Sequence, residues 1–340
     1  PRRLARVQPP AHGAALLVVR PRAIAPVMRL RTLGKTGIEI PELCLGTWGL
    51  SGDGYGPVDE AEQGQVIERA LGLGLPAFAT AAAYAKGAME SRLGRLLEAH
   101  ANAIVITKVG TDREQTPPVK RFDAEHLRAA AKKSKERLKR RIDVLLLHNP
   151  SSIALEKPHV AETLNALVED GTVRTWGASV GDAGTGKLAM ERGAHVLELA
   201  YSAFHPQDLS GVVEMAKEKQ VGLLGRSVLA HGLLCGQWPN TKQFDSGDHR
   251  RDRWTGDDFR KRISQLAALR PSVTGDVTSL RAAALRYALS QTALSSVVIG
   301  PRSSVQLDQL VRDAGKEPPY LTDDSKHALE ARLSNVGIRP

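Results

Sequence analysis

The 340 residues are 42 % apolar and 25 % charged, enough to bury the core of one large α/β domain or two small ones. No run of about 18 apolar residues occurs, so the sequence predicts no membrane-spanning helix. The two cysteines, Cys44 and Cys235, lie far apart without a Cys-x-x-Cys pattern. This argues against a disulfide framework or a zinc site and favours a reducing, cytoplasmic setting.

The formal charge of +10 does not by itself indicate nucleic-acid binding. Five arginines lie in residues 1–27, an acid-free, Pro- and Ala-rich leader that we expect to stand outside the fold, with the folded domain in residues 28–340. The leader lacks the unbroken apolar core of a signal peptide, and Met28 opens a more ordinary beginning. A second basic run, residues 132–141, is interpreted as a solvated helix face, because aromatic residues make up only 4 % of the chain.

In chain order, residues 29–40 alternate around a Gly-Lys-Thr-Gly turn and predict a small β-hairpin. Helical segments then separate short apolar strands, such as the helix predicted over 59–73, which Asp59 caps and Gly74 ends. The predicted strands are residues 43–47, 77–80, 103–108, 143–148, 173–179, 195–200, 221–226 and 296–299. Eight such strands imply a parallel sheet covered on both faces, and eight is the number that closes into a (β/α)8 TIM barrel.

An open doubly wound sheet is the competing architecture. Against it, the first strand is followed by Gly46-Thr47-Trp48-Gly49, whose spacing differs from the Gly-x-Gly-x-x-Gly of a pyrophosphate turn. Residues 237–271 are polar and interrupt the alternation after the seventh strand, so we interpret them as a loop insertion over the barrel mouth. The segment from Leu321 onward is predicted to be a closing helix.

Three polar side chains stand at neighbouring strand ends. Tyr84 lies on the turn after the second strand, and Lys108 and His148 end the third and fourth strands. Because the carboxyl ends of barrel strands line the active site, we expect the three to meet at one rim. An ammonium and an imidazole beside a phenol, whose ordinary pKa is about 10, promote proton transfer near neutral pH, which suits general acid catalysis.

The stretch Ala77 to Gly94 resembles the aldo/keto reductase family, whose pattern is Phe-Asp-Thr-Ala-x-x-Tyr-Gly followed by Ser-Glu and Leu-Gly. The resemblance implies that Tyr84 is the general acid, that Lys108 tunes it and that His148 orients the carbonyl. The aspartate of the family pattern is Ala79 in this chain. Lys108 is therefore expected to lack its carboxylate partner.

The resemblance also implies a nicotinamide dinucleotide cofactor. Where the family has Ser-Asn, this chain has Ser179-Val180, and Glu198 replaces a glutamine just before Tyr201, which matches the family's stacking tyrosine. Arg302, in the turn after the eighth strand, points to NADPH over NADH, since a helix N-terminus with an arginine attracts a 2′-phosphate. The remaining residues that the resemblance places in the cofactor site are Gly46, Thr47, Trp48, Arg226, Leu229, Gly232, Gly300, Ser303, Gln306 and Gln309.

These features predict an NADPH-dependent reductase of small-molecule aldehydes or ketones, weakened by Ala79, with no metal, nucleic acid or membrane partner. One alternative is a catalytically weak or inactive family member that binds nucleotide and serves as a regulatory or partner-binding module. Another is a barrel with some other chemistry, since a fold does not fix a function. The sequence does not indicate an oligomeric state.

Overall fold

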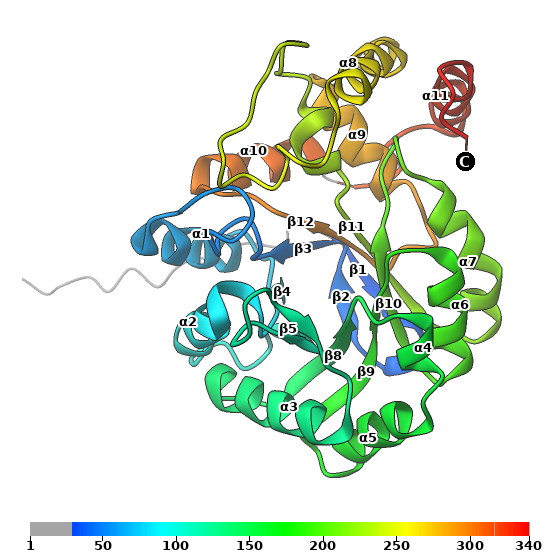
Figure 1. Ribbon diagram of the computed structural model, residues 1–340. Coiled ribbons are helices and arrows are strands. Elements are labelled where there is room, and N and C mark those ends of the chain that lie inside the picture. Colours follow the sequence, from blue (N-terminus) through cyan, green and yellow to red (C-terminus); the bar gives the residue numbers. More distant parts are fainter. Residues whose placement is uncertain (1–28, 316, 340) are drawn as a thin grey trace, which may run out of the picture.

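The computed structural model describes residues 29–315 and 317–339, so the predicted leader, residues 1–27, lies outside the described residues. Eight parallel strands form a closed barrel in the order β10-β11-β12-β3-β4-β5-β8-β9 (Figure 1). Their bounds are β3 Leu43–Gly46, β4 Ala77–Ala79, β5 Ile104–Val109, β8 Ile142–His148, β9 Val173–Ser179, β10 Val196–Ala200, β11 Gly222–Arg226 and β12 Ser296–Ile299. The predicted (β/α)8 barrel is confirmed.

Helices cover the outside of the barrel (Figure 1). One begins as the sequence predicts, where Asp59 accepts a hydrogen bond from the Ala61 N–H, and another begins where Asp123 accepts one from the His126 N–H. The helices between strands are α1 Glu60–Gly72, α2 Ala88–Leu96, α3 Ala124–Leu138, α4 Ser152–Leu155, α5 Pro158–Glu169, α6 Ala183–Glu191, α7 Gln207–Glu218 and α9 Leu280–Leu289, and α10 Ser304–Ala314 follows β12.

The predicted N-terminal hairpin is also present and closes one end of the barrel. It consists of β1 (Leu30–Thr32) and β2 (Glu39–Pro41), joined through the short 3₁₀ turn η1 (Gly34–Thr36). Its Leu33, Ile38 and Ile40 are buried among the apolar side chains of the barrel interior. The Lys35 N–H donates to the Gln220 carbonyl, just before β11 begins, so this is the end at which the strands start. The carboxyl ends of the strands are left for a site.

The insertion after β11 differs from the predicted loop in one respect. It contains a 10-residue helix, α8 (Gly256–Gln265), and the short turns η3 (Ala230–Cys235), η4 (Leu266–Ala268) and η5 (Arg270–Ser272) lie at its borders. The insertion reaches the loop after β3, where Tyr55 and Asp248 form a β-bridge and the His249 N–H donates to the Gly54 carbonyl at 2.8 Å. It therefore lies over the end of the barrel at which the strands finish, as the sequence predicted.

The C-terminal helix α11 (Asp323–Asn335) packs on the end of the insertion. Arg332 on this helix donates to the Ala268 carbonyl at 3.0 Å and to Ser272 at 2.8 Å. A small antiparallel pair, β6 (Thr111–Asp112) and β7 (Val119–Lys120), follows β5 and was not predicted.

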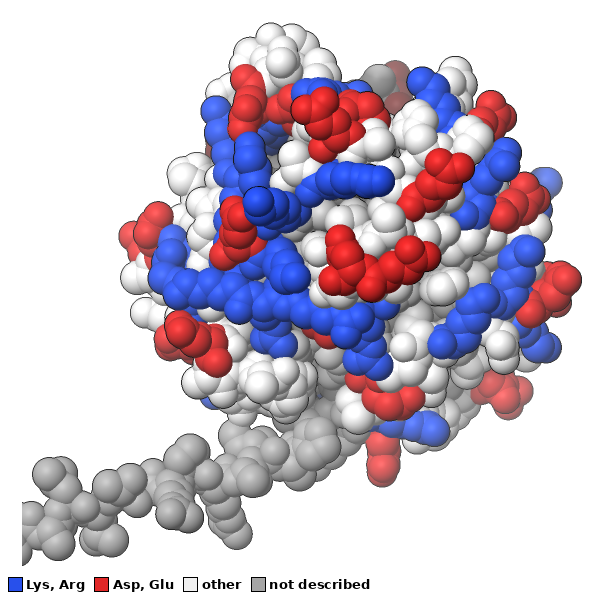
Figure 2. All heavy atoms as spheres, turned by 90° about the horizontal axis from the view of Figure 1, so that it is seen from below, with Lys and Arg blue, Asp and Glu red and all other residues white. Residues whose placement is uncertain are grey.

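Acidic side chains lie among the basic run of α3. Arg137 pairs with Glu90 at 3.2 Å, and Lys133 and Lys139 lie 3.7 and 3.5 Å from Glu114 and Glu98. Figure 2 shows basic and acidic side chains interspersed over the face seen from below. Such a mixed surface is typical of solvated barrel helices.

Candidate active site

The structure brings Tyr84, Lys108 and His148 together at the carboxyl ends of β4, β5 and β8. Tyr84 begins the 3₁₀ turn η2 (Tyr84–Gly87), and its ring lies 6.0 Å from that of His148, centroid to centroid, at an interplanar angle of 84°. The Lys108 ammonium lies 5.6 Å from the centroid of the Tyr84 ring and donates to the Thr80 carbonyl at 3.2 Å. The predicted grouping therefore exists, and all three side chains belong to one rim.

Lys108 has a carboxylate partner, contrary to the expectation drawn from Ala79. Its Nζ lies 3.2 Å from Oε1 of Glu198, at the middle of β10, and the two side chains are 4 % and 1 % exposed. Burial opposes the charged ammonium, but the attraction of Glu198 outweighs it and raises the pKa of Lys108. The expectation that Lys108 lacks a carboxylate partner is wrong, because β10 supplies the negative charge.

Glu198 is engaged on both of its oxygens. Ser179 donates its hydroxyl to Oε2 at 2.6 Å, and the Arg226 Nε lies 3.9 Å from the same oxygen. Arg226 also donates to the Val180 carbonyl at 2.8 Å. Burial raises the pKa of Glu198, but the cations and hydrogen bonds outweigh it and lower the pKa overall. Ser179 and Glu198 are thus hydrogen-bonded to each other, so they are not two free ligands for a cofactor amide.

The protonation states of the two other groups follow from burial. Burial raises the pKa of Tyr84 although the neighbouring Lys108 acts in the opposite direction, so the phenol stays protonated at neutral pH. Burial and the cations Lys108, Lys120 and Arg226 lower the pKa of His148 well below 6.5. Its Nδ1 is buried without a hydrogen-bond partner. The site therefore combines a neutral phenol and a neutral imidazole with a charged ammonium.

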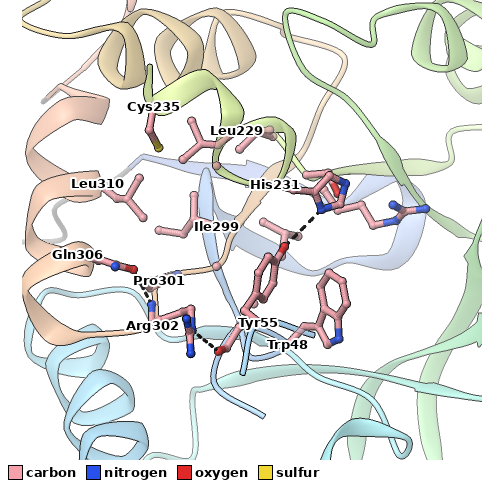
Figure 3. A pocket seen from close by; sticks show the side chains of 18 of the residues that line it. Trp48, Tyr55, Leu229, His231, Cys235, Ile299, Pro301, Arg302, Gln306 and Leu310 are labelled. Atoms are coloured by element: carbon pink, nitrogen blue, oxygen red, sulfur yellow. Dashed lines mark hydrogen bonds between the residues drawn. The ribbon is translucent and has the colours of Figure 1, made fainter. Parts of the chain in front are cut away.

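A cavity of about 430 Å³ is lined by Tyr84 and Lys108 of this rim and extends to α10, whose Gln306 and Leu310 are on its wall in Figure 3. Trp48 and Tyr55 line it on one side, and Arg302 and Gln306 line it near the start of α10. The predicted residues that line it are Gly46, Trp48, Ala79, Tyr84, Lys108, Glu198, Arg226, Leu229, Gly232, Gly300, Arg302, Gln306 and Gln309. One continuous cavity thus connects the catalytic candidates with the predicted phosphate turn.

Five predicted residues do not line this cavity. His148 stands beside Tyr84, Thr47 donates its hydroxyl to the Ala79 carbonyl, Ser179 faces Glu198, and Ser303 caps α10. The fifth, Tyr201, is 2 % exposed and stacks on Tyr287 of α9 with ring centroids 5.9 Å apart. The prediction that Tyr201 stacks on a cofactor is corrected, because its ring is buried against Tyr287 and does not line the cavity.

The turn before α10 is cationic but partly engaged within the protein. Arg302 donates to the carbonyls of Gly49, Gly56 and Pro57 at 3.3, 3.0 and 3.1 Å, and its backbone N–H donates to Gln306. Arg302 therefore fastens the loop after β3 to the cavity wall. A second guanidinium, Arg281 of α9, also lines the cavity and donates to Gln309 at 3.0 Å. The sequence analysis did not identify Arg281.

The insertion contributes wall residues that the sequence analysis also missed. Arg250 lies over the ring of Tyr55 at 4.9 Å and over that of Trp238 at 5.2 Å, held by Asp248 at 2.8 Å. The Tyr55 hydroxyl lies 3.3 Å from Nδ1 of His231. A glycine-rich stretch around Tyr55 and an Asp-His-Arg run in the insertion were the available signals, but neither indicates which loops meet.

Comparison with known proteins agrees with this architecture. Residues 42–325 match the model of the aldo/keto reductase family. The chain is 29 % identical over 298 residues to L-galactose dehydrogenase of Arabidopsis thaliana, covering 84 % of this chain and 87 % of that protein. It is 24 % identical over 300 residues to an aldo-keto reductase of Bacillus subtilis, covering 85 % and 89 %.

Solved structures share the fold. A glycerol dehydrogenase of Gluconobacter oxydans superposes with a TM-score of 0.79 at 23 % identity, covering 92 % of this chain and 97 % of that one. The holo form of an aldo-keto reductase of Bacillus halodurans gives a TM-score of 0.75 at 22 % identity, covering 90 % and 96 %.

The protein defined by this barrel and rim belongs to the aldo/keto reductase family. The family consists of oxidoreductases that generally use NAD(P)H and act on small-molecule carbonyl compounds. Within residues 29–315 and 317–339, no group of three or more His, Cys, Asp or Glu side chains is placed to hold a metal ion. No helix in that part of the chain is long and apolar enough to cross a membrane.

Proposed function

We propose that this protein reduces small aldehydes or ketones to alcohols with NADPH, with Tyr84 as the general acid. The observation that carries the proposal is the meeting of Tyr84, Lys108 and His148 at one rim, where Tyr84 and Lys108 line one end of a cavity whose other end is the start of α10. Proton donor and phosphate-binding turn thus face the same space.

The residues present fit a nicotinamide dinucleotide best at its phosphate end. There the N-terminus of α10 and Arg302 offer backbone and guanidinium donors to phosphate groups, and the charge of Arg302 favours a cofactor that carries a 2′-phosphate. Arg281 lines the same cavity, but Asp313 balances its charge at 2.5 Å. Leu229 and Gly232 line the cavity on the way to the catalytic rim. When bound, the cofactor supplies the hydride that the carbonyl carbon receives.

Tyr84 donates its proton to the carbonyl oxygen as that oxygen gains negative charge. Lys108 stabilises the phenolate that remains, and the neutral His148 can hold the carbonyl oxygen through a ring N–H. Lys108 and Arg226 carry two positive charges against one negative charge on Glu198. The rim therefore has a net positive charge where the transition state becomes negative, and such fixed charges stabilise it.

Turnover of a simple aromatic aldehyde, followed by the loss of NADPH absorbance, tests the proposal. Tyr84→Phe should reduce kcat by at least about 10²-fold, the lower end of what general acid catalysis contributes, while NADPH binding is retained. Tyr201→Phe is the matched control, since it removes the hydroxyl of a buried tyrosine that does not line the cavity. Equal turnover by Tyr84→Phe and the parent protein would refute the role of Tyr84.

One observation favours the alternative of a nucleotide-binding module without efficient turnover. Ser179 and Glu198 bond to each other, and Val180 has no side-chain donor or acceptor, so the cofactor amide meets fewer free partners than the family pattern provides. NADPH fluorescence that changes on mixing, without turnover of any aldehyde in a broad panel, is the result that would establish this second function.

A further inference from the structure

We propose that Glu198 is the positioning residue for Lys108, supplying from β10 the carboxylate that position 79 on β4 lacks. The inference rests on the proposed reductase function, because it concerns the group that supports Tyr84. Ala79 and Glu198 both depart from the family pattern, and the inference explains them together: the carboxylate is missing at position 79 and present at position 198.

Burial makes a partner for Lys108 necessary. The residue is 3 % exposed, and an isolated buried ammonium is destabilised strongly enough to lose its proton. Within the described residues, Glu198 is the only carboxylate that forms an ion pair with it, at 3.2 Å. The Thr80 carbonyl accepts a second hydrogen bond at 3.2 Å, but it carries no net charge. The charge of Lys108 therefore depends on Glu198.

The pair spans the mouth of the barrel. Strands β8 and β9 lie between β5 and β10, so the two side chains extend toward each other across the interior from strands that are not neighbours. Ser179 on β9 fixes the orientation of the carboxylate through a 2.6 Å hydrogen bond to Oε2, which leaves Oε1 for the lysine. Ala79 lines the same cavity and contributes only a methyl group.

Glu198 also limits the positive charge at the rim. Arg226 approaches the same carboxylate at 3.9 Å, so replacing Glu198 with a neutral residue leaves two neighbouring cations without a balancing charge. Their repulsion and the burial of Lys108 then act in the same direction, toward a neutral lysine. A neutral lysine no longer stabilises the phenolate of Tyr84.

Four proteins test this: the parent, Glu198→Gln, Ala79→Asp, and the double variant that carries both changes. The first readout is the pKa of Lys108, measured by NMR on protein with labelled lysine side chains, and it does not require turnover. The second is kcat and KM for NADPH and an aromatic aldehyde. Glu42→Gln is the matched control, because Glu42 is a buried carboxylate paired with Arg31 near the hairpin end of the barrel.

Glu198→Gln should lower the pKa of Lys108 until it lies about one to two units below the assay pH. Only about a tenth to a hundredth of the lysine is then charged, so kcat should fall roughly ten- to a hundredfold. Glu42→Gln should leave the pKa of Lys108 unchanged. Ala79→Asp alone should give no gain in kcat, because the lysine already has a partner. The double variant restores one carboxylate beside the lysine and should recover kcat to within a few-fold of the parent.

An unchanged pKa of Lys108 in Glu198→Gln would overturn the inference, and so would a tenfold gain in kcat from Ala79→Asp alone. If Glu198→Gln does not fold, the double variant must fold for the inference to stand, and failure of both overturns it. If no protein turns over any aldehyde, but the pKa of Lys108 falls in Glu198→Gln and recovers in the double variant, the proposed function fails and the inference stands.

Discussion

Acidification should destabilise the mouth of this barrel through two neutral histidines, His231 and His249. Burial, followed by the nearby Arg253, lowers the pKa of His231 to about 3 and that of His249 to about 4, from 6.5. Their rings lie 5.1 Å apart, and Arg250 and Arg226 also repel a proton on His231. Neither ring can take a proton in the folded protein until the pH is far below neutral.

The sign follows from proton counting. Below pH 6.5 the unfolded chain binds protons at these histidines and the folded chain does not, so the free energy of unfolding falls as the pH falls. At pH 5 the unscreened loss is about 2 kcal/mol for each ring, taking 1.36 kcal/mol for each unit below 6.5. Both rings are partly exposed, so solvent screening should reduce the loss to about 1 kcal/mol each.

His231→Gln removes one of these titrations. Urea unfolding at pH 7 and pH 5 should show that the parent loses about 2 kcal/mol through the two rings, and that the variant loses about 1 kcal/mol less than the parent. His327→Gln, which removes an exposed imidazole on α11, is the control. Its free energy of unfolding should fall between pH 7 and pH 5 by the same amount as that of the parent. The same pH dependence in His231→Gln and in the parent would refute the reasoning.

Two further predictions concern the cofactor turn and the hairpin. The parent should bind NADPH about tenfold or more tightly than NADH, since a charge-assisted contact to phosphate contributes roughly 1.5–3 kcal/mol, and Arg302→Ala should erase this preference. Titration with both nucleotides measures the two affinities, and equal affinities in the parent would contradict the prediction. Gly34→Ala should destabilise the fold by roughly 2–4 kcal/mol, because the φ of Gly34 is +52° and a Cβ there would collide with the Gln220 carbonyl. Gly64→Ala is the control: Gly64 lies inside α1 with open space around its Cβ position, so this change should stabilise the fold by up to about 1 kcal/mol. Denaturation curves of the two glycine variants check this, and a Gly34→Ala protein as stable as the parent contradicts it.

The strands and most helices were predictable because their signals are local. The run of residues 144–147 is buried on both faces and is therefore apolar throughout, and Asp59 marks the start of α1 by its own hydrogen bond. Helix α8 was missed because its 10 residues contain only two large apolar side chains, Phe259 and Ile263, and such a short apolar pattern among charged residues resembles a polar loop. Its signals were weaker: Thr255 as the cap and two aspartates in the first turn.

The error over Tyr201 shows what a motif match omits. Side chains alternate between the two faces of a strand, so residues separated by three positions, such as Glu198 and Tyr201, are not expected to face the same side. Glu198 faces the barrel interior, and Tyr201 accordingly stacks on Tyr287 in the helical layer. The alternation of side chains along the strand therefore already indicated that only one of Glu198 and Tyr201 would face the cavity.

The exchange between Ala79 and Glu198 needed the folded barrel. In the sequence, the two positions depart from the family pattern separately. Ala79 suggests that Lys108 has lost its carboxylate partner, and Glu198 suggests that the site has lost an amide donor. The two positions lie on β4 and β10, which do not pair, and only the closed sheet brings a side chain from β10 to the end of β5. Because the lysine requires a negative charge but not one from a particular strand, a loss at one position and a gain at the other preserve the same ion pair. The two substitutions therefore have to be tested together. Glu198→Gln alone leaves Lys108 with no carboxylate, and Ala79→Asp alone gives it two.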